Sequence, residues 1–170
     1  MSAGFVGEGV RPAIRDAKNR LLSGNGRMIP ESGEIKIALL SKSAELSRLI
    51  SVGKVRGYDL SDFNSITCKK FDLHLNQKPL LLSESKVAFK IDLNDLKEKE
   101  TDERIMRLSA LKNGFCIGVI QWIKINLYES VVYENRPGQT TSHWPTPIFL
   151  FDTPLEVKKG QTIKIRASLL

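Results

Sequence analysis

The sequence predicts a mainly β protein: an antiparallel, barrel-like β domain preceded by an N-terminal helix and strand. Three observations support this prediction. Apolar and polar residues alternate in several short segments of the second half. Turn residues recur about every ten positions, as in sandwiches and barrels. The 170 residues, 41% of them hydrophobic, are enough for one domain with a core.

The N-terminal segment has helical rather than alternating spacing. Val10, Ile14 and Leu21 fall near one helix face, and Pro12 suits a first turn. The segment 23–26 contains two glycines, which can end a helix in a left-handed cap. We therefore expect a helix over 10–22, and an extended chain from residue 28.

The remaining elements follow from alternation and turn residues. Strands are expected at 34–40, 71–75, 87–93, 115–127 and 148–151, and a hairpin is expected from 155–157 and 162–165 around a turn at 158–161. Residues 43–51 suit a short helix, 53–65 and 134–138 are turn-like, and the charged segment 94–107 predicts a loop with a helical turn. Gly114 and Gly118 allow a bulge in the longest strand.

The net charge and the number of cysteines indicate which partners and which cellular compartment to expect. The net charge is +7, but the longest run of basic residues is a pair, so nucleic acid is not the expected partner. No apolar segment is long enough to span a membrane, and the N-terminus does not resemble a signal peptide. The two cysteines fit a reducing compartment. We expect a cytoplasmic protein, with a nuclear location open for a eukaryote.

Common enzyme motifs are missing from the sequence. There is no phosphate-binding loop, and the glycines at 24 and 26 follow a helix rather than a strand, so they do not form a dinucleotide fingerprint. The cysteines and histidines do not pair at zinc-ligand spacing, so no metal site is expected. A Cys–His or Ser–His nucleophile stays open, although no nucleophile-elbow motif supports one.

Two local features need an explanation. Ser142, His143 and Trp144 lie in a loop flanked by prolines, and Glu8 lies between two glycines just before the first expected helix. Taken alone, the loop could simply fill the mouth of a barrel. Glu8 alone could be a solvated carboxylate stabilised by the helix dipole.

Together these features resemble the C-terminal part of a protein arginine N-methyltransferase. The segment 7–22 resembles the second half of the family's double-glutamate loop and the helix that follows it. Four further segments resemble family motifs in the family's order: 26–30, 57–61, 114–122, and 142–144 together with the closing hairpin at 154–161. The last is the most specific, because the Ser-His-Trp motif and the hairpin occur at the family's spacing.

The resemblance implies a domain division and a role for each motif residue. Residues 1–30 would be the end of a methyltransferase domain and 31–170 the substrate-side β-barrel. Glu8 would be one of two carboxylates that hold the substrate guanidinium and leave one nitrogen poised for methylation. His143 would support the pocket, and Ser142 and Trp144 would contact substrate.

The departures from the family pattern define further expectations. The first glutamate and the adenosyl-binding region would precede Met1. The full-length enzyme would therefore use S-adenosylmethionine, whereas this chain alone would bind no cofactor and be inactive. The implied partner is an arginine-containing protein or peptide. A homodimer is compatible with the family, although no dimerisation arm is evident over 61–86.

Two alternatives stay open. The chain could be a non-catalytic β-barrel module that binds RNA or an acidic protein through its positive charge. It could also be a methyltransferase-like relative that acts on another nucleophile or on none.

Overall fold

The computed structural model describes residues 9–74, 78–94, 102–138, 142 and 144–169. The elements are α1 (Val10–Arg20), β1 (Ser32–Ser41), α2 (Ala44–Ile50), β2 (Lys54–Val55), β3 (Tyr58–Asp59), the 3-10 helix η1 (Ser61–Ser65), β4 (Lys70–Leu73), β5 (Lys86–Asp92), β6 (Asp102–Ser109), β7 (Gly114–Tyr128), β8 (Val131–Glu134), β9 (Thr146–Val157) and β10 (Thr162–Leu169).

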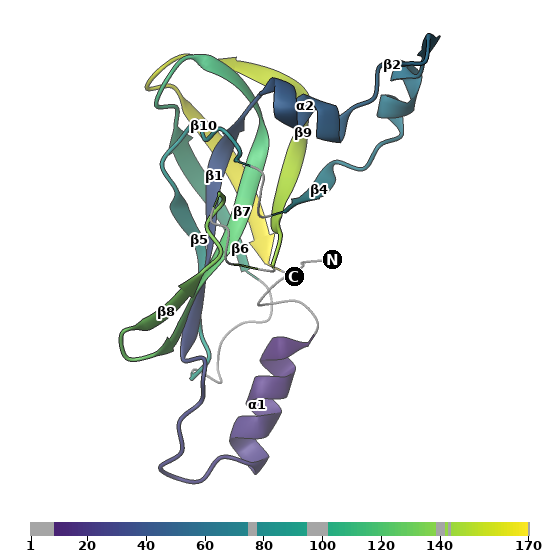
Figure 1. The fold of residues 1–170 in the computed structure, drawn as a ribbon. Helices are drawn as coiled ribbons and strands as arrows, with labels where there is room; N and C mark the ends of the chain where they lie inside the picture. The colour runs from purple at the N-terminus through teal and green to yellow at the C-terminus, as the bar shows by residue number, and fades with distance from the viewer. Residues whose placement is uncertain (1–8, 75–77, 95–101, 139–141, 143, 170) are drawn as a thin grey trace.

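The described strands form an antiparallel, barrel-like arrangement, which confirms the predicted fold class (Figure 1). One sheet has the order β4-β9-β7-β1-β5, and β8 pairs with β7. Strands β6 and β10 form a separate pair. The main hydrophobic core contains side chains from β1, β5, β7, β6 and β10, so the separate pair packs across the large sheet.

Strand β7 is the centre of the large sheet. One of its edges bonds to β1 from Cys116 to Asn126. Its other edge bonds first to β9 and then to β8. Strand β1 is buried on both faces: Ile35, Ile37 and Leu39 face the main core, and Ala38 and Leu40 face a second core beneath α2. The large sheet therefore has a hydrophobic core on each of its two faces at β1.

A bulge at Gly118 divides the side chains of β7 between the two cores. The register with β1 and the register with β9 both shift beside this glycine. Val119 and Ile123 face the main core, whereas Ile117 and Ile120 face the second core. Strict alternation along 115–127 predicts Ile117 and Val119 on one face, and this prediction is wrong because the expected bulge separates them.

Three parts of the sheet differ from the sequence expectations. Residues 102–109, expected as part of a charged loop, form β6, because only Met106 and Leu108 need to face the core and the remaining side chains stay exposed. The segment 162–169 pairs with β6 rather than folding back on 155–157 as a hairpin. Strand β8 was not expected, because it is short and its first two residues are exposed.

Residues 51–69 form a projection that we call the arm. It contains the β2–β3 hairpin and η1, and it extends away from both sheets (Figure 1). Asn64 closes its base, because the side chain accepts from the Val52 amide at 2.9 Å and donates to the Val52 carbonyl at 2.8 Å. The sequence had shown only a turn-like region here.

Helix α1 confirms the N-terminal helix prediction, but it lies outside the cores. None of its residues is fully buried, and Ile14 packs only partly against the main core. Lys18 Nζ donates to the Asn94 carbonyl at 2.6 Å, which ties the helix to the end of β5. Within the described ranges, neither α1 nor α2 has the length and apolar character needed to cross a bilayer.

Gly118→Ala should destabilise the chain by about 2 kcal/mol, because added atoms in a packed interior force backbone shifts. A Cβ at this position would lie 2.2 Å from the Phe149 carbonyl oxygen. Gly53→Ala is the matched control, since nothing lies within 4 Å of its Cβ. Urea unfolding of both variants measures the difference, and equal free energies of unfolding would contradict the close approach of β7 and β9.

Candidate functional site

Of the four residues expected to contact or support substrate, two are described. Glu8 and His143 lie outside the described residues. Ser142 is buried and Trp144 is 48% exposed, and both come just before β9 begins at Thr146. We call the described residues Ser142 and 144–146 the Trp144 loop.

The loop occupies the place where β8 and β9 diverge along the same edge of β7. Strand β9 bonds to β7 as far as Ile120, and β8 begins its pairing at Lys124. Gln121, Trp122 and Ile123 of β7 lie between these pairings. The sheet therefore leaves a gap in its ladder where the loop can approach β7.

Tyr133 on β8 holds the loop through two contacts. Its hydroxyl is hydrogen-bonded to Ser142 Oγ, and its ring meets the Trp144 ring edge-on at 5.7 Å and 80°. Ser142 Oγ also accepts from the Trp144 amide at 3.1 Å. One buried hydroxyl thus fixes the backbone of Trp144, while the indole reaches solvent.

Asn135 holds the other side of the loop. Its side-chain oxygen accepts from the Ile123 amide at 2.8 Å, and its side-chain nitrogen donates to the carbonyls of Trp144 and Pro145, each at 3.4 Å. The residue is buried, so these bonds satisfy its amide group. Asn135 replaces the missing strand pairing by joining β7 directly to the loop.

Sequence reasoning missed both Tyr133 and Asn135. The segment 134–138 was expected to be a turn. The expectation gave no sign that Asn135 within it is buried and joins β7 to the Trp144 loop. The apolar and aromatic run 131–133 was the available signal, because β-branched and aromatic residues favour strands.

Glu134 lies between these two residues and makes a separate set of contacts. Its Oε1 accepts from Trp122 Nε1 at 2.7 Å and from Lys36 Nζ at 3.0 Å. Burial raises the pKa of the Glu134 carboxyl, but the bonds from Trp122 and Lys36 and the charges of Lys36 and Lys124 outweigh burial, so the pKa lies below its ordinary value. Lys36 also lies 5.8 Å from the Trp122 ring centre.

The arrangement suits recognition of a cationic side chain. An exposed indole attracts a guanidinium over its face, and Tyr133 and Asn135 fix the loop that carries it. The clustered carboxylates that a divalent metal needs are not found among the described residues. Of the two free cysteines, Cys68 is exposed and Cys116 is buried, and burial raises the pKa of the Cys116 thiol.

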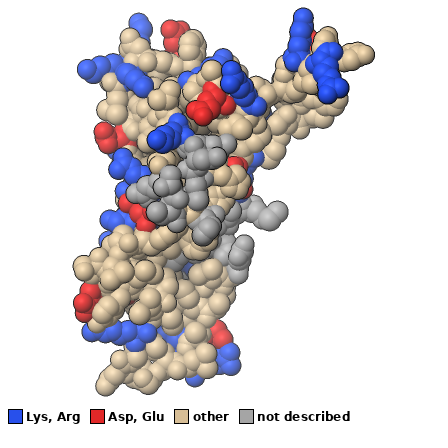
Figure 2. Space-filling model, in the orientation of Figure 1, with Lys and Arg blue, Asp and Glu red and all other residues tan. Residues whose placement is uncertain are grey.

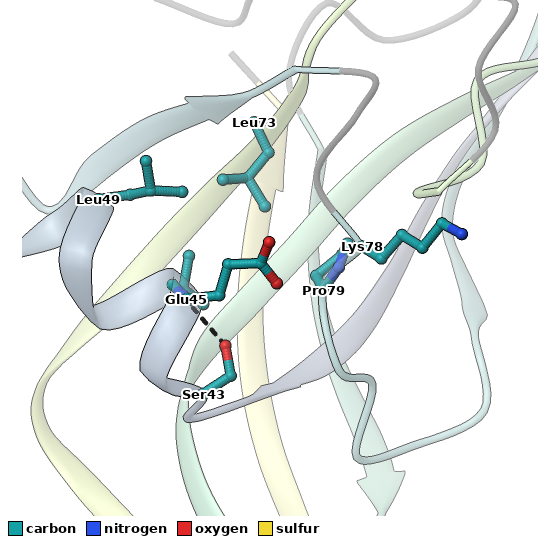
Figure 3. A pocket seen from close by; sticks show the side chains of 7 residues that line it. Ser43, Glu45, Leu49, Leu73, Lys78 and Pro79 are labelled. Carbon is teal, nitrogen blue, oxygen red and sulfur yellow. Dashed lines mark hydrogen bonds between the residues drawn. The ribbon is translucent and has the colours of Figure 1, made fainter.

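The described residues do not show the glycine turn between a strand and a helix that dinucleotide cofactors use. Here the glycines at 24 and 26 follow α1 and lead into β1, and the first amides of α2 are capped by Ser43 Oγ, which accepts from Leu46 at 3.1 Å. The nearby pocket between α2 and β4 has a volume of about 10 Å³, enough for roughly one water molecule (Figure 3).

On the face in Figure 2, the positive charge does not form one continuous surface. Lys and Arg are separated there by acidic and uncharged side chains, and some of them lie at the tip of the arm. Lys54 and Arg56 belong to the hairpin at this tip. This face therefore lacks the basic stripe that a nucleic-acid groove needs.

Comparison with known families decides the assignment. Residues 32–170 match the model of the arginine methyltransferase oligomerization subdomain. The chain belongs to this family. The match starts two residues after Pro30 and covers both sheets, so the arginine methyltransferase resemblance of the sequence is confirmed.

Two relatives show how much of an arginine methyltransferase this chain covers. It is 29% identical over 168 residues to an arginine N(omega)-methyltransferase of Streptomyces achromogenes subsp. streptozoticus, covering 98% of this chain and 46% of the relative. The PRMT1 enzyme–prozyme heterotetrameric complex of Trypanosoma brucei with AdoHcy has the same fold, with a TM-score of 0.73 and 18% identity over 92% of this chain and 53% of that one. This chain therefore spans about half the length of these two relatives.

Asn135→Ala should free the Trp144 loop and cost about 2 kcal/mol, because it leaves the buried Ile123 amide without its acceptor. Acrylamide should then quench tryptophan fluorescence more strongly, and urea unfolding should show the lost stability. Asn126→Ala is the control, since its side chain makes a longer 3.4 Å bond to Glu31. Unchanged quenching in the Asn135 variant would show that the loop has other anchors.

The Glu134 cluster should weaken in acid. Because the folded-state pKa is lowered, its stabilisation is complete above the unfolded value, near 4.5, and is lost as the pH falls through the lower folded value. Glu134→Gln should remove this part of the pH dependence. Urea unfolding between pH 6 and pH 3 tests this; parallel profiles for both proteins would contradict the assigned ion pair.

Proposed function

We propose that this chain is the substrate-side β-barrel of an S-adenosylmethionine-dependent protein arginine methyltransferase, with residues 31–170 as the barrel and 1–30 as the end of the methyltransferase domain. The observation that carries the proposal is the Trp144 loop. A half-exposed indole on a loop fixed by Tyr133 and Asn135 is suited to a guanidinium substrate. The likeness to a bacterial arginine N(omega)-methyltransferase over 98% of the chain supports it.

The remaining site residues complete the proposal. Glu8 would hold the substrate guanidinium, His143 would support the pocket, and Ser142 and Trp144 would contact the substrate arginine. Glu8 directly precedes Gly9, which caps α1 with a left-handed backbone. A carboxylate there is close in sequence to a helix N-terminus, where negative charge is stabilised.

The chain alone would be inactive, because methyl transfer needs a bound methyl donor and the family resemblance assigns no donor-binding residue to this sequence. S-adenosylmethionine would be bound by another part of the full-length protein. We also place the protein in the cytoplasm, since both described cysteines are free thiols and unpaired thiols are the rule in reducing compartments.

The full-length protein, supplied with radiolabelled S-adenosylmethionine, should methylate arginine in a peptide substrate. Trp144→Ala should lower kcat/KM about tenfold, the value of one cation–aromatic contact. Phe115→Ala is the control, because this aromatic side chain is also exposed but lies near the other end of β7. Absence of labelled arginine would refute the function, and equal loss in both variants would refute the role of Trp144.

A second part of the proposal concerns association. The arm exposes three large apolar side chains: Tyr58 is 75%, Phe63 58% and Ile66 80% exposed. Apolar side chains grouped on a projection mark an interaction surface, and the matching family model is an oligomerization subdomain. We therefore propose that the arm joins two copies of the full-length protein as a homodimer.

Ile66→Asp in the full-length protein should shift the dimer toward monomer, because it places a charge in the apolar contact. Sedimentation velocity should show at least a tenfold weaker association, since a buried unpaired charge costs more than 1.4 kcal/mol. Ile105→Asp is the control: this isoleucine is similarly exposed but lies on β6. A stable dimer in the Ile66 variant would remove the arm from the interface.

A further inference from the structure

Strand β8 carries both residues that hold the Trp144 loop, but its own backbone attachment is slight. The strand has four residues, and the first two are exposed. Its pairing with β7 contains an irregularity and ends at Glu134. Short segments with few buried contacts open locally at a low cost in free energy. The positions of Tyr133 and Asn135 therefore depend on what fixes the end of β8.

The Glu134 side chain fixes this end of the strand to the interior. Glu134 lies opposite Lys124 in the register, and Trp122 lies two positions away along β7, on the same face. Glu134 Oε1 accepts from Trp122 Nε1 at 2.7 Å. Trp122 is 1% exposed and packs in the second core. The carboxylate therefore reaches toward the gap in the ladder and joins β8 to a side chain that the core holds in place.

Lys36 limits the carboxylate to this orientation. Its Nζ donates to the same Glu134 oxygen at 3.0 Å, and Lys36 lies opposite Trp122 in the register of β1 with β7. The side chains of Lys36 and Glu134 are only 20% and 25% exposed, so both are largely withdrawn from water. Hydrogen bonds between charged groups are shorter and stronger than neutral ones. Side chains from three neighbouring strands thus meet at one fixed carboxylate.

The residues on either side of Glu134 are the ones that brace the loop. Successive side chains of a strand point to opposite faces of the sheet. Tyr133 packs against the main core and contacts the loop, whereas Glu134 contacts a residue of the second core. Asn135 follows directly and joins β7 to the loop. Loss of the bond between Glu134 and Trp122 would therefore displace Trp144 through the two neighbours of Glu134.

We propose that Glu134 is a positioning residue for substrate binding: its bond to Trp122 holds the end of β8, and β8 in turn sets the place of the Trp144 indole. This inference rests on the proposed function, because that function assigns the contact with the substrate guanidinium to Trp144. An interaction that is equally strong in the ground state and the transition state changes KM and leaves kcat unaltered. Glu134 thus determines how tightly the substrate is bound.

Peptide methylation by the full-length protein tests this role. Glu134→Ala should raise the KM for an arginine peptide about fivefold and leave kcat within about twofold. A merely structural role would instead lower the concentration of active enzyme, and so lower kcat at an unchanged KM. Glu34→Ala is the matched control and should leave KM unchanged. Glu34 also lies opposite Lys124, but on β1, and its removal leaves both bonds of Glu134 in place.

A conservative variant and a double variant sharpen the kinetic test. Glu134→Gln keeps an oxygen that accepts from Trp122 Nε1, so its KM should stay within about twofold of the wild-type value. In a Trp144→Ala background, Glu134→Ala should have no further effect on kcat/KM. A residue that acts through Trp144 loses its effect once that indole is absent, whereas independent effects would add.

A measurement without methylation separates this inference from the proposed function. In the full-length protein labelled with fluorotryptophan, the fluorine NMR resonance that Trp144→Phe removes identifies Trp144. Glu134→Ala should shift this resonance, whereas Glu134→Gln and Glu34→Ala should leave it in place. Should Glu134→Ala not fold, Trp122→Phe replaces it, because this variant removes the same bond and leaves no buried donor unpaired.

Two results would overturn the inference. The first is an unchanged Trp144 resonance in Glu134→Ala, which would show that the loop keeps its place without the bond. The second is an equal effect of Glu134→Ala with and without Trp144, which would place its action elsewhere. A wild-type protein that methylates no arginine would refute the proposed function, and the fluorine resonance would still decide whether Glu134 positions the loop.

Discussion

Burial of β7 on both faces, with hydrogen bonds along both edges, is the constraint on which the described structure depends. The buried side chains of this strand enter one of two cores, and the bulge at Gly118 changes which core receives them. One edge is filled by β1, and the other is divided between β9 and β8. The break between β9 and β8 creates the place for the Trp144 loop. The candidate site is thus a consequence of how one central strand shares its edge.

The sequence predicted those elements whose burial shows in their residue pattern. Strands β1, β5 and β7 and helices α1 and α2 lie where spacing and turn residues placed them. Strand β6 was missed because its core-facing residues are few and charges surround them. The partner of β10 was wrong because local turn residues favour a hairpin, whereas burial of Ile163 and Leu169 against β6 decides the pairing. Such long-range pairing leaves no mark in a short window of sequence.

The candidate site shows the same division. The Ser142 and Trp144 motif could be selected from its residue types and their spacing, and the structure places the pair on a braced loop. The bracing residues Tyr133 and Asn135 could not be selected, because their roles exist only once β8 pairs with β7. Glu8 and His143 lie outside the described residues, so their roles stay predictions that depend on the family resemblance.

The base of the arm has a further consequence. The chain returns from the arm through β4, whose Leu73 pairs with Thr146 at the start of β9, two positions beyond Trp144; the Thr146 hydroxyl donates to the Leu73 carbonyl at 3.5 Å. If the arm binds a neighbouring subunit, a displacement of the arm is transmitted to the Trp144 loop through the pairing of β4 with β9. Quaternary assembly and substrate affinity would then be mechanically linked by neighbouring residues, with no relay across the barrel.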